Sequence, residues 1–325
     1  MHCKIKKINN WILIQDKESE LWFNGYLLNS SLDFFQAQVV NSIKNLNFNK
    51  KEFSEWLRSI DGCFAFVLQY GECTIAAVDK VRSIPLFYFE KNKDYIISND
   101  SSYISSMAQD NSLADSCIPL EVAMSGYSLG GRTLYPNIVQ LTAGEFIFSC
   151  KGRRLDNYYY YTYSPWKVID SNRDSLINQL SEVVLSSMQS LIDNANGRQI
   201  VIPLSSGKDS RLIASALKYL GAKDVICFCY GLPNNFEEKI SQSVAEKLGY
   251  KWFSVHTLPK LQKEYFLSHE FDQCMSNSDT FGATPIILDL FAIHLIRQKG
   301  LISSDAIIVN GNTGDYLSGG HVSSK

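Results

Sequence analysis

Short apolar runs separated by turn residues characterise the first half of the chain. Breaks at Gly71-Glu72 and at residues 91–94 are typical of hairpin turns, so the runs predict an antiparallel meander. The expected strands are 11–14, 21–23, 63–70, 73–78, 85–89, 95–98 and 144–149. Helical spacing occurs between them at 33–45 and 53–60. This pattern predicts an α+β domain over residues 1–165.

The pattern changes after Pro165. A long amphipathic helix at 173–192 is followed by alternating strands and helices, which is typical of a parallel sheet. The expected strands are 200–204, 224–230, 252–255 and 306–309, and the expected helices are one ending at Gly221, one at 237–248 and one starting at Thr284-Pro285. We therefore predict a doubly wound α/β domain over 166–325, with its ligands at the carboxyl ends of the strands.

The segment Ser205-Ser206-Gly207-Lys208-Asp209-Ser210 joins the first of these strands to a helix. Such a junction directs unpaired backbone N–H groups and the positive helix end at one place, which binds phosphate. Gly207 allows close approach of a ligand, and Ser205 and Ser210 offer hydroxyl donors. The carboxylate of Asp209 would repel phosphate, so its presence implies a bridging Mg²⁺.

Another interpretation of this segment is a polar helix cap, in which Ser205 or Asp209 satisfies backbone donors. The segment is not a Walker A loop, because Ile202 stands where that loop needs glycine and Asp209 stands where it needs serine or threonine. Lys208 is compatible with either a phosphate contact or a solvated loop position.

Composition narrows the function classes. The 325 residues are 45% hydrophobic and carry a net charge of −2, which allows two domains and gives no basic footprint for nucleic acid. Eight cysteines lack CxxC or zinc-type spacing and are expected to be reduced core residues. No stretch approaches the ~20 apolar residues of a membrane span. We expect a cytoplasmic protein with small-molecule partners and no membrane; a homodimer is compatible with the sequence.

Four ordered segments of the second half resemble the asparagine synthetase and PP-loop ATP-pyrophosphatase superfamily. Residues 204–210 resemble its Ser-Gly-Gly-x-Asp-Ser loop, with Ser206 replacing the first glycine, and residues 238–249 resemble its second helix. Gly311 resembles the family glycine that contacts nucleotide, and Asp315 its second magnesium and pyrophosphate carboxylate. The resemblance implies ATP and Mg²⁺ as cofactors, with Asp209 and Asp315 as catalytic and metal-binding residues. The implied nucleotide-binding residues are Ser205, Ser206, Gly207, Asp209, Ser210, Gly311 and Asp315.

The reaction that this resemblance implies is ATP-dependent amide-bond formation. MgATP adenylates a carboxylate, pyrophosphate leaves, and ammonia or an amine attacks. Asn312 stands where many members have glutamate, so a base for the attacking amine must lie elsewhere. One rival function is a PP-loop enzyme that modifies tRNA, which the lack of a basic patch disfavours. Another is a non-catalytic relic, because the family continues with a helical segment beyond Gly319-Gly320 and an incomplete synthetase domain is expected.

The first half resembles the Ntn-type glutaminase domain of class II amidotransferases, in a degenerate form. The resemblance lies in Phe23-Asn24-Gly25, in Asp61–Phe66 and in Ile84–Tyr88. A working glutaminase of this class needs cysteine as the first residue, because its own α-amino group assists the thiol as a base. Here Cys3 follows Met1-His2, so we expect no glutamine hydrolysis.

Overall fold

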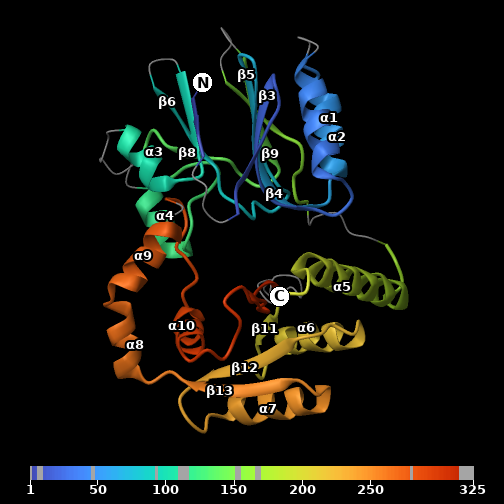
Figure 1. Cartoon of the computed structure of the whole chain (residues 1–325), viewed down its shortest axis with the longest axis vertical. Coiled ribbons are helices and arrows are strands. Elements are labelled where there is room, and N and C mark those ends of the chain that lie inside the picture. Colours follow the sequence, from blue (N-terminus) through green and yellow to red (C-terminus); the bar gives the residue numbers. More distant parts are fainter. Residues whose placement is uncertain are drawn as a thin grey trace. The chain divides into compact units, whose positions relative to one another are not determined.

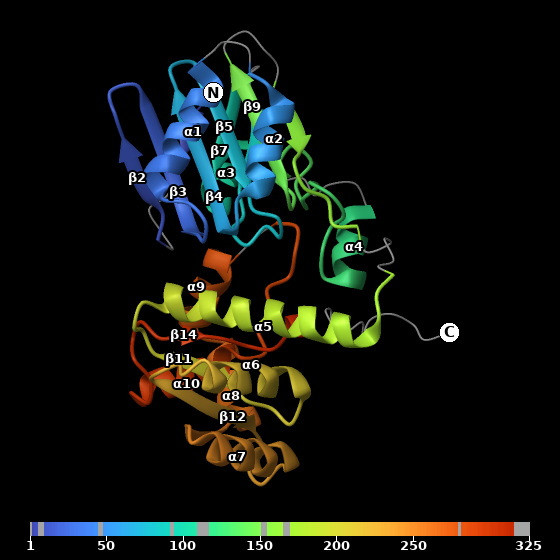
Figure 2. The same cartoon turned by 90° about the vertical axis from the view of Figure 1, so that its right-hand side faces the viewer.

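The computed structural model describes residues 2–5, 10–44, 48–91, 94–108, 117–150, 155–164, 170–278 and 281–314. The fold is mixed α/β and contains both antiparallel and parallel sheets. The chain divides into two compact units (Figures 1 and 2). Unit 1 comprises Met1–Lys167 and Cys274–Pro285, and unit 2 comprises Val168–Gln273 and Ile286–Lys325. Each unit has its own sheets and core, so each is described by itself.

The larger sheet of unit 1 is the predicted antiparallel meander. Its strands follow the order β10-β9-β5-β4-β3-β2, and every neighbouring pair is antiparallel. They are β2 (Ile12–Gln15), β3 (Ser19–Leu27), β4 (Gly62–Tyr70), β5 (Cys73–Val78), β9 (Glu145–Cys150) and β10 (Asp156–Tyr159). The hairpin at Gly71-Glu72 is confirmed, because Tyr70 pairs with Cys73 and Gly71 adopts a φ of 55°.

A second sheet in unit 1 divides the predicted strands into two groups. Its order is β1-β7-β6-β8, with β1 parallel to β7. Its strands are β1 (His2–Lys4), β6 (Phe87–Lys91), β7 (Asp94–Ser98) and β8 (Val139–Gln140). The pattern of apolar runs predicted strands near β6 and β7 but not their separate sheet, because alternation along a strand carries no information about which sheet it joins.

Unit 1 is layered as helix, sheet, sheet and helix. Its helices are α1 (Leu32–Lys44), α2 (Lys50–Ser59), α3 (Ser101–Ala108) and α4 (Cys117–Ser125). Phe35 of α1 and Phe53 of α2 share one apolar cluster with the six-stranded sheet. Val67 and Ile97 belong to a second cluster between the two sheets, and Ile104 of α3 packs on the outer face of the smaller sheet. Figure 1 shows this order of layers.

The expectation of reduced core cysteines is wrong for one pair. Cys73 on β5 lies opposite Cys150 on β9, and the two form a disulfide across adjacent strands. No sequence motif indicates this bond, because the two cysteines are 77 positions apart and meet only when the sheet forms. Cys227 and Cys229 are buried as predicted, whereas Cys117 is exposed.

Unit 2 is built on one parallel sheet. Its strands are β11 (Ile200–Pro203), β12 (Val225–Gly231), β13 (Lys251–His256) and β14 (Ile307–Ile308), in the order β13-β12-β11-β14. The chain runs outward from β11 through β12 to β13 and then returns to the other side of β11. The strand order therefore reverses beside β11, and a crevice opens at the carboxyl ends of strands at such a point.

Helices cover both faces of the parallel sheet. Those of the second half are α5 (Arg173–Ala195), α6 (Lys208–Tyr219), α7 (Phe236–Leu248), α8 (Pro259–Phe266), α9 (His269–Ser278) and α10 (Leu290–Gln298). Ile202 packs with Leu217 of α6 on one face. Val201, its neighbour on β11, packs with Ala292 of α10 on the opposite face. This alternation gives the sheet an apolar layer on each side.

The helix expected to start at Thr284-Pro285 begins instead at Leu290. The N–H of Thr284 donates to the carbonyl of Gly126, and Ala283 forms a bridge with Tyr127. These contacts hold Ala283 and Thr284 against unit 1 residues in a bridge instead of a helix, so tertiary pairing overrides the local helix signal. The helices α8 and α9 were not predicted. In the part of the chain that the structure describes, no helix is both long and apolar enough to cross a membrane.

Candidate functional site

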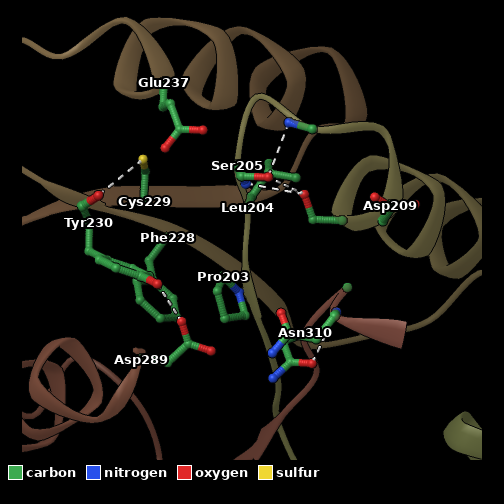
Figure 3. A pocket seen from close by; sticks show the side chains of 14 residues that line it. Pro203, Leu204, Ser205, Asp209, Phe228, Cys229, Tyr230, Glu237, Asp289 and Asn310 are labelled. Carbon is green, nitrogen blue, oxygen red and sulfur yellow. Dashed lines mark hydrogen bonds between the residues drawn. The ribbon is translucent and has the colours of Figure 1, made fainter. Parts of the chain in front are cut away.

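A cavity of about 400 Å³ lies in unit 2 at the carboxyl ends of β11 and β12 and beside the segment after β14 (Figure 3). The cavity lies where the strand order reverses. The volume of the cavity falls within the range of small-molecule sites. The lining residues are Pro203, Leu204, Ser205, Gly207, Asp209, Ser210, Phe228, Cys229, Tyr230, Glu237, Asp289, Asn310, Gly311 and Asn312.

The loop between β11 and α6 is closed by its own hydroxyl groups. The N–H of Ser205 donates to Ser210 Oγ at 3.1 Å, and the two hydroxyl oxygens lie 3.0 Å apart. The N–H of Gly207 donates to Ser205 Oγ at 3.1 Å. These bonds turn the chain tightly from the strand into the helix. Ser205 thus satisfies one backbone donor, as the helix-cap interpretation proposed.

The start of α6 nevertheless remains open to a ligand. Gly207 occupies the N-cap position, and no side chain caps the helix. The first N–H groups of a helix have no partner within it, and the helix dipole adds positive character at this end. Asp209 lies in the first turn and lines the cavity. The arrangement offers backbone donors to an anion, with one carboxylate beside them.

Two glycines after β14 pack against this same turn. A methyl group added to Gly311 would lie 2.8 Å from the backbone nitrogen of Ser210 and 3.1 Å from Asp209 Cβ. One added to Gly314 would overlap the Asp209 carboxyl group. The sequence-predicted residues Ser205, Asp209 and Gly311 therefore meet at one place. Asp315, the residue after Gly314, lies outside the described residues.

Ser206 links the loop to the next helix of the unit. Its hydroxyl donates to Glu237 Oε1 at 2.9 Å, and Glu237 is in the first turn of α7. Ser206 therefore links the loop before α6 to the first turn of α7 beside the cavity. Glu238, which the resemblance placed in the second helix, accepts from the N–H of Asn234 and does not line the cavity.

Tyr230, near the carboxyl end of β12, and Asp289, directly before α10, form another wall of the cavity. The Tyr230 hydroxyl donates to Asp289 Oδ1 at 2.5 Å (Figure 3). Burial, and then this hydrogen bond to a carboxylate, raise the pKa of Tyr230. Burial also raises the pKa of the neighbouring Cys229 thiol. Both groups therefore stay protonated at neutral pH, and neither serves as a ready base or nucleophile.

Oxygen atoms dominate the polar part of the site, which suits a hard cation such as Mg²⁺. Among the described residues there is no group of three or more His, Cys, Asp or Glu side chains that could hold a metal alone. Mg²⁺ usually needs only one or two carboxylates and takes its other ligands from phosphate and water. Asp209, which lines the cavity and has no hydrogen-bond partner among the described residues, fits that requirement.

Sequence reasoning missed the part of the site formed by Tyr230, Glu237, Asp289 and Asn310. Tyr230 and Asn310 had a usable signal, because each lies at the carboxyl end of an expected strand. Asp289 had none, since the helix that it precedes was expected to begin at Thr284-Pro285. Glu237 could be found only once its contact with Ser206 was known.

The unit 1 residues that resemble glutaminase motifs lie within paired strands. Cys3 lies within β1, where its backbone pairs with Ile97 on β7. Asn24 and Gly25 lie inside β3 and pair with β4. Gly25 has a φ of 110°, and a side chain there would collide with the backbone of Cys63 and Phe64. The glycine is therefore required for strand pairing, independently of any ligand.

No protein-family model matches this chain, and no curated protein matches it at a significant level. Solved structures that resemble it include the NH3-dependent NAD synthetase from Campylobacter jejuni, at 15% identity and a TM-score of 0.30. That match covers 44% of this chain, which spans 59% of the synthetase's length. The glutamine phosphoribosylpyrophosphate amidotransferase from B. subtilis is 12% identical, with a TM-score of 0.32 over 80% of this chain and 76% of its own. An allosteric regulatory enzyme of purine biosynthesis is 11% identical, with a TM-score of 0.31 over 95% and 73%. Similarity at this level carries no information on the activity of this chain.

Proposed function

We propose that unit 2 binds MgATP in the cavity at the carboxyl ends of β11 and β12 and uses it to form an amide bond, in the manner of the asparagine synthetases that its motifs resemble. The observation that carries the proposal is the meeting of the Ser205–Ser210 loop, Asp209 and Gly311 at the uncapped start of α6. An uncapped helix start at a strand end is a phosphate-binding arrangement.

The proposed reaction has two steps. A carboxylate oxygen of the substrate attacks the α-phosphorus of ATP, and pyrophosphate leaves with the electrons of the bond that breaks. The nitrogen of ammonia or an amine then attacks the acyl carbon, AMP leaves, and the nitrogen loses a proton. Backbone N–H groups at the start of α6 and the hydroxyls of Ser205 and Ser210 would stabilise the charge on the phosphates.

Mg²⁺ bound at this site would neutralise phosphate charge that the Asp209 carboxylate would otherwise repel. We propose Asp209 as one ligand, and Asp315, which lies outside the described residues, as the second. The base for the amine is not Tyr230 or Cys229, since burial raises the pKa of both. For unit 1 we propose a glutaminase-like fold without glutamine hydrolysis, since Cys3 follows two residues and lacks the terminal amino group that this chemistry uses.

The test is pyrophosphate release from ATP, measured with a panel of carboxylates and with ammonia or simple amines. We expect release with at least one carboxylate and a fall of about 100-fold or more in Asp209→Ala, because a charged group at a phosphoryl site contributes several kcal/mol to the transition state. The matched control is Asp305→Ala, an exposed aspartate outside the cavity. Equal release by the wild type and by Asp209→Ala would reject the site.

A further inference from the structure

Asp289 directly precedes a helix, a position where an aspartate side chain normally accepts hydrogen bonds from the first N–H groups of that helix. It is the N-cap residue of α10, yet its side chain makes no capping hydrogen bond. Aspartate is among the preferred N-cap residues because its carboxylate accepts from the first N–H groups of the helix. Here the carboxylate accepts from Tyr230 instead, and both residues line the cavity. Asp289 has helical backbone angles, with a φ of −87° and a ψ of −15°, instead of the extended angles of a capping residue, so its carboxylate is available to the cavity.

One oxygen of Asp289 is left over by this arrangement. Tyr230 donates its only hydroxyl hydrogen to Oδ1, and Oδ2 has no hydrogen-bond partner among the described residues. Figure 3 shows Oδ2 pointing away from the tyrosine, on the side of the cavity opposite Glu237. This wall therefore presents acceptors and no spare donor. A ligand group that meets it gains a hydrogen bond only if it carries an N–H or O–H.

The two ends of the cavity thus differ in chemistry. Backbone donors and Asp209 lie at the start of α6. The Tyr230–Asp289 pair lies near the carboxyl end of β12 and at the start of α10, with the ring of Phe228 next to Tyr230. A nucleoside triphosphate has the same asymmetry, with phosphates at one end and a flat base at the other. If the phosphates occupy the α6 end, the base reaches the wall that accepts hydrogen bonds.

We propose that Asp289, oriented by Tyr230, determines base specificity by accepting a hydrogen bond from the 6-amino group of adenine and rejecting bases with a 6-oxo group. The inference rests on the proposed function and adds the residue that selects the nucleotide. A 6-oxo group would place one acceptor against another at this position, and a buried polar group without a partner is costly. We expect ATP to bind about tenfold or more tightly than inosine triphosphate, because hydrogen bonds to charged groups are the stronger ones.

The decisive variant is Asp289→Asn, which keeps the shape of the side chain. Tyr230 would donate to the amide oxygen, leaving the amide NH2 to face the base. An NH2 donor complements a 6-oxo group and opposes a 6-amino group, so the preference should move toward inosine triphosphate. The measurement is the dissociation constant of the full chain for magnesium ATP, magnesium inosine triphosphate and magnesium tripolyphosphate, by calorimetric titration.

Tripolyphosphate carries no base, so its affinity should be the same in the wild type and in Asp289→Asn. The control Asp305→Asn, an exposed aspartate outside the cavity, should keep the wild-type ratio of ATP to inosine triphosphate affinity. Tyr230→Phe, which removes the hydroxyl that holds Asp289, should reduce the ratio without inverting it. A loss of folding in either variant would appear as weaker tripolyphosphate binding, and the change in ratio would still report on the base.

An unchanged ratio in Asp289→Asn would overturn the inference while tripolyphosphate binding still supported the phosphate site. A wild type that bound neither nucleotide nor tripolyphosphate would overturn the proposed function, and this inference with it.

Discussion

Two aspartates, one in each unit, show how differently the two parts of the molecule use a carboxylate. Asp79 of unit 1 is fully buried, and its oxygens accept from the N–H groups of Phe64, Val81 and Ser83. Asp209 of unit 2 is partly exposed, lines a cavity, and has no hydrogen-bond partner among the described residues. The Asp79 carboxylate accepts hydrogen bonds from the backbone, whereas the Asp209 carboxylate accepts none from the described residues.

The glycines follow the same division. Gly25 of unit 1 makes room for the backbone of the neighbouring strand, while Gly311 of unit 2 makes room at the start of α6 beside Asp209. A carboxylate without a partner and an uncapped helix start that lie together in a cavity are what the proposed phosphate site requires. The polar groups compared in unit 1 are used within its own fold, whereas Asp209 and the start of α6 in unit 2 are available to the proposed ligand.

The largest effect that would sharpen this contrast is the loss of the disulfide in unit 1. Replacing Cys73 and Cys150 by serine should lower the free energy of unfolding of unit 1 by about 2–5 kcal/mol, because the bond restricts the unfolded chain over a long loop. Hydrogen exchange should show faster opening of β5 and β9 with β11 and β12 unchanged. Equal loss of protection in both units would contradict the independence of their cores.

A smaller effect is expected for the link between α6 and α7. Ser206→Ala removes the hydroxyl that donates to Glu237, and should destabilise unit 2 by about 1 kcal/mol. The double-mutant cycle with Glu237→Ala, which removes the acceptor, isolates that interaction when each variant is unfolded in urea. Strictly additive effects of the two substitutions would show that the contact contributes nothing.

The smallest effect concerns Glu238. Hydrogen bonds from Ser254, and then from the N–H of Asn234 and from His256, hold the pKa of its carboxyl below the usual value. A lowered pKa means that the folded state favours the charged form of Glu238. The stabilisation of the fold by this carboxylate is therefore fully present at neutral pH. It is lost as the pH falls below 4.5, the ordinary pKa, and then through the lowered pKa of the folded state.

The variant Glu238→Gln should therefore be less stable than the wild type at neutral pH, and the difference should shrink in acid. Thermal unfolding across this pH range checks it. A difference that grew on acidification would show the sign to be wrong. Its partner His256 is about half exposed, with 47% of its side-chain surface accessible, so solvent screens the interaction and keeps the effect small.

The hydrophobic pattern predicted much of the fold, since runs such as 63–70 and 73–78 report both strand type and length. It did not predict the second sheet of unit 1, the return of residues 281–285 to that unit, or the Cys73–Cys150 bond. Each depends on which distant segments pair, and alternation along the chain does not encode partners.

Only part of the candidate site was predicted, because its other residues are brought to the cavity by pairing between distant segments. Ser205, Asp209 and Ser210 lie in one short segment whose local order already implies a phosphate loop, and Gly311 follows an expected strand. Asp289 comes from a segment whose local helix signal was overridden by tertiary pairing, so its place at the cavity appears only in the folded chain. Asp315 stays a prediction.

The claim on which the rest depends is that the start of α6 and the segment after β14 form one phosphate site. The most direct measurement is the affinity for magnesium tripolyphosphate of Gly311→Ala, whose added methyl group would press on the backbone of Ser210. The comparison is Gly300→Ala, which strains the backbone at a φ of 62° but lies outside the cavity. We predict a loss of about tenfold or more in Gly311→Ala and none in the control. Wild-type affinity in Gly311→Ala would contradict the convergence of these two segments on a phosphate.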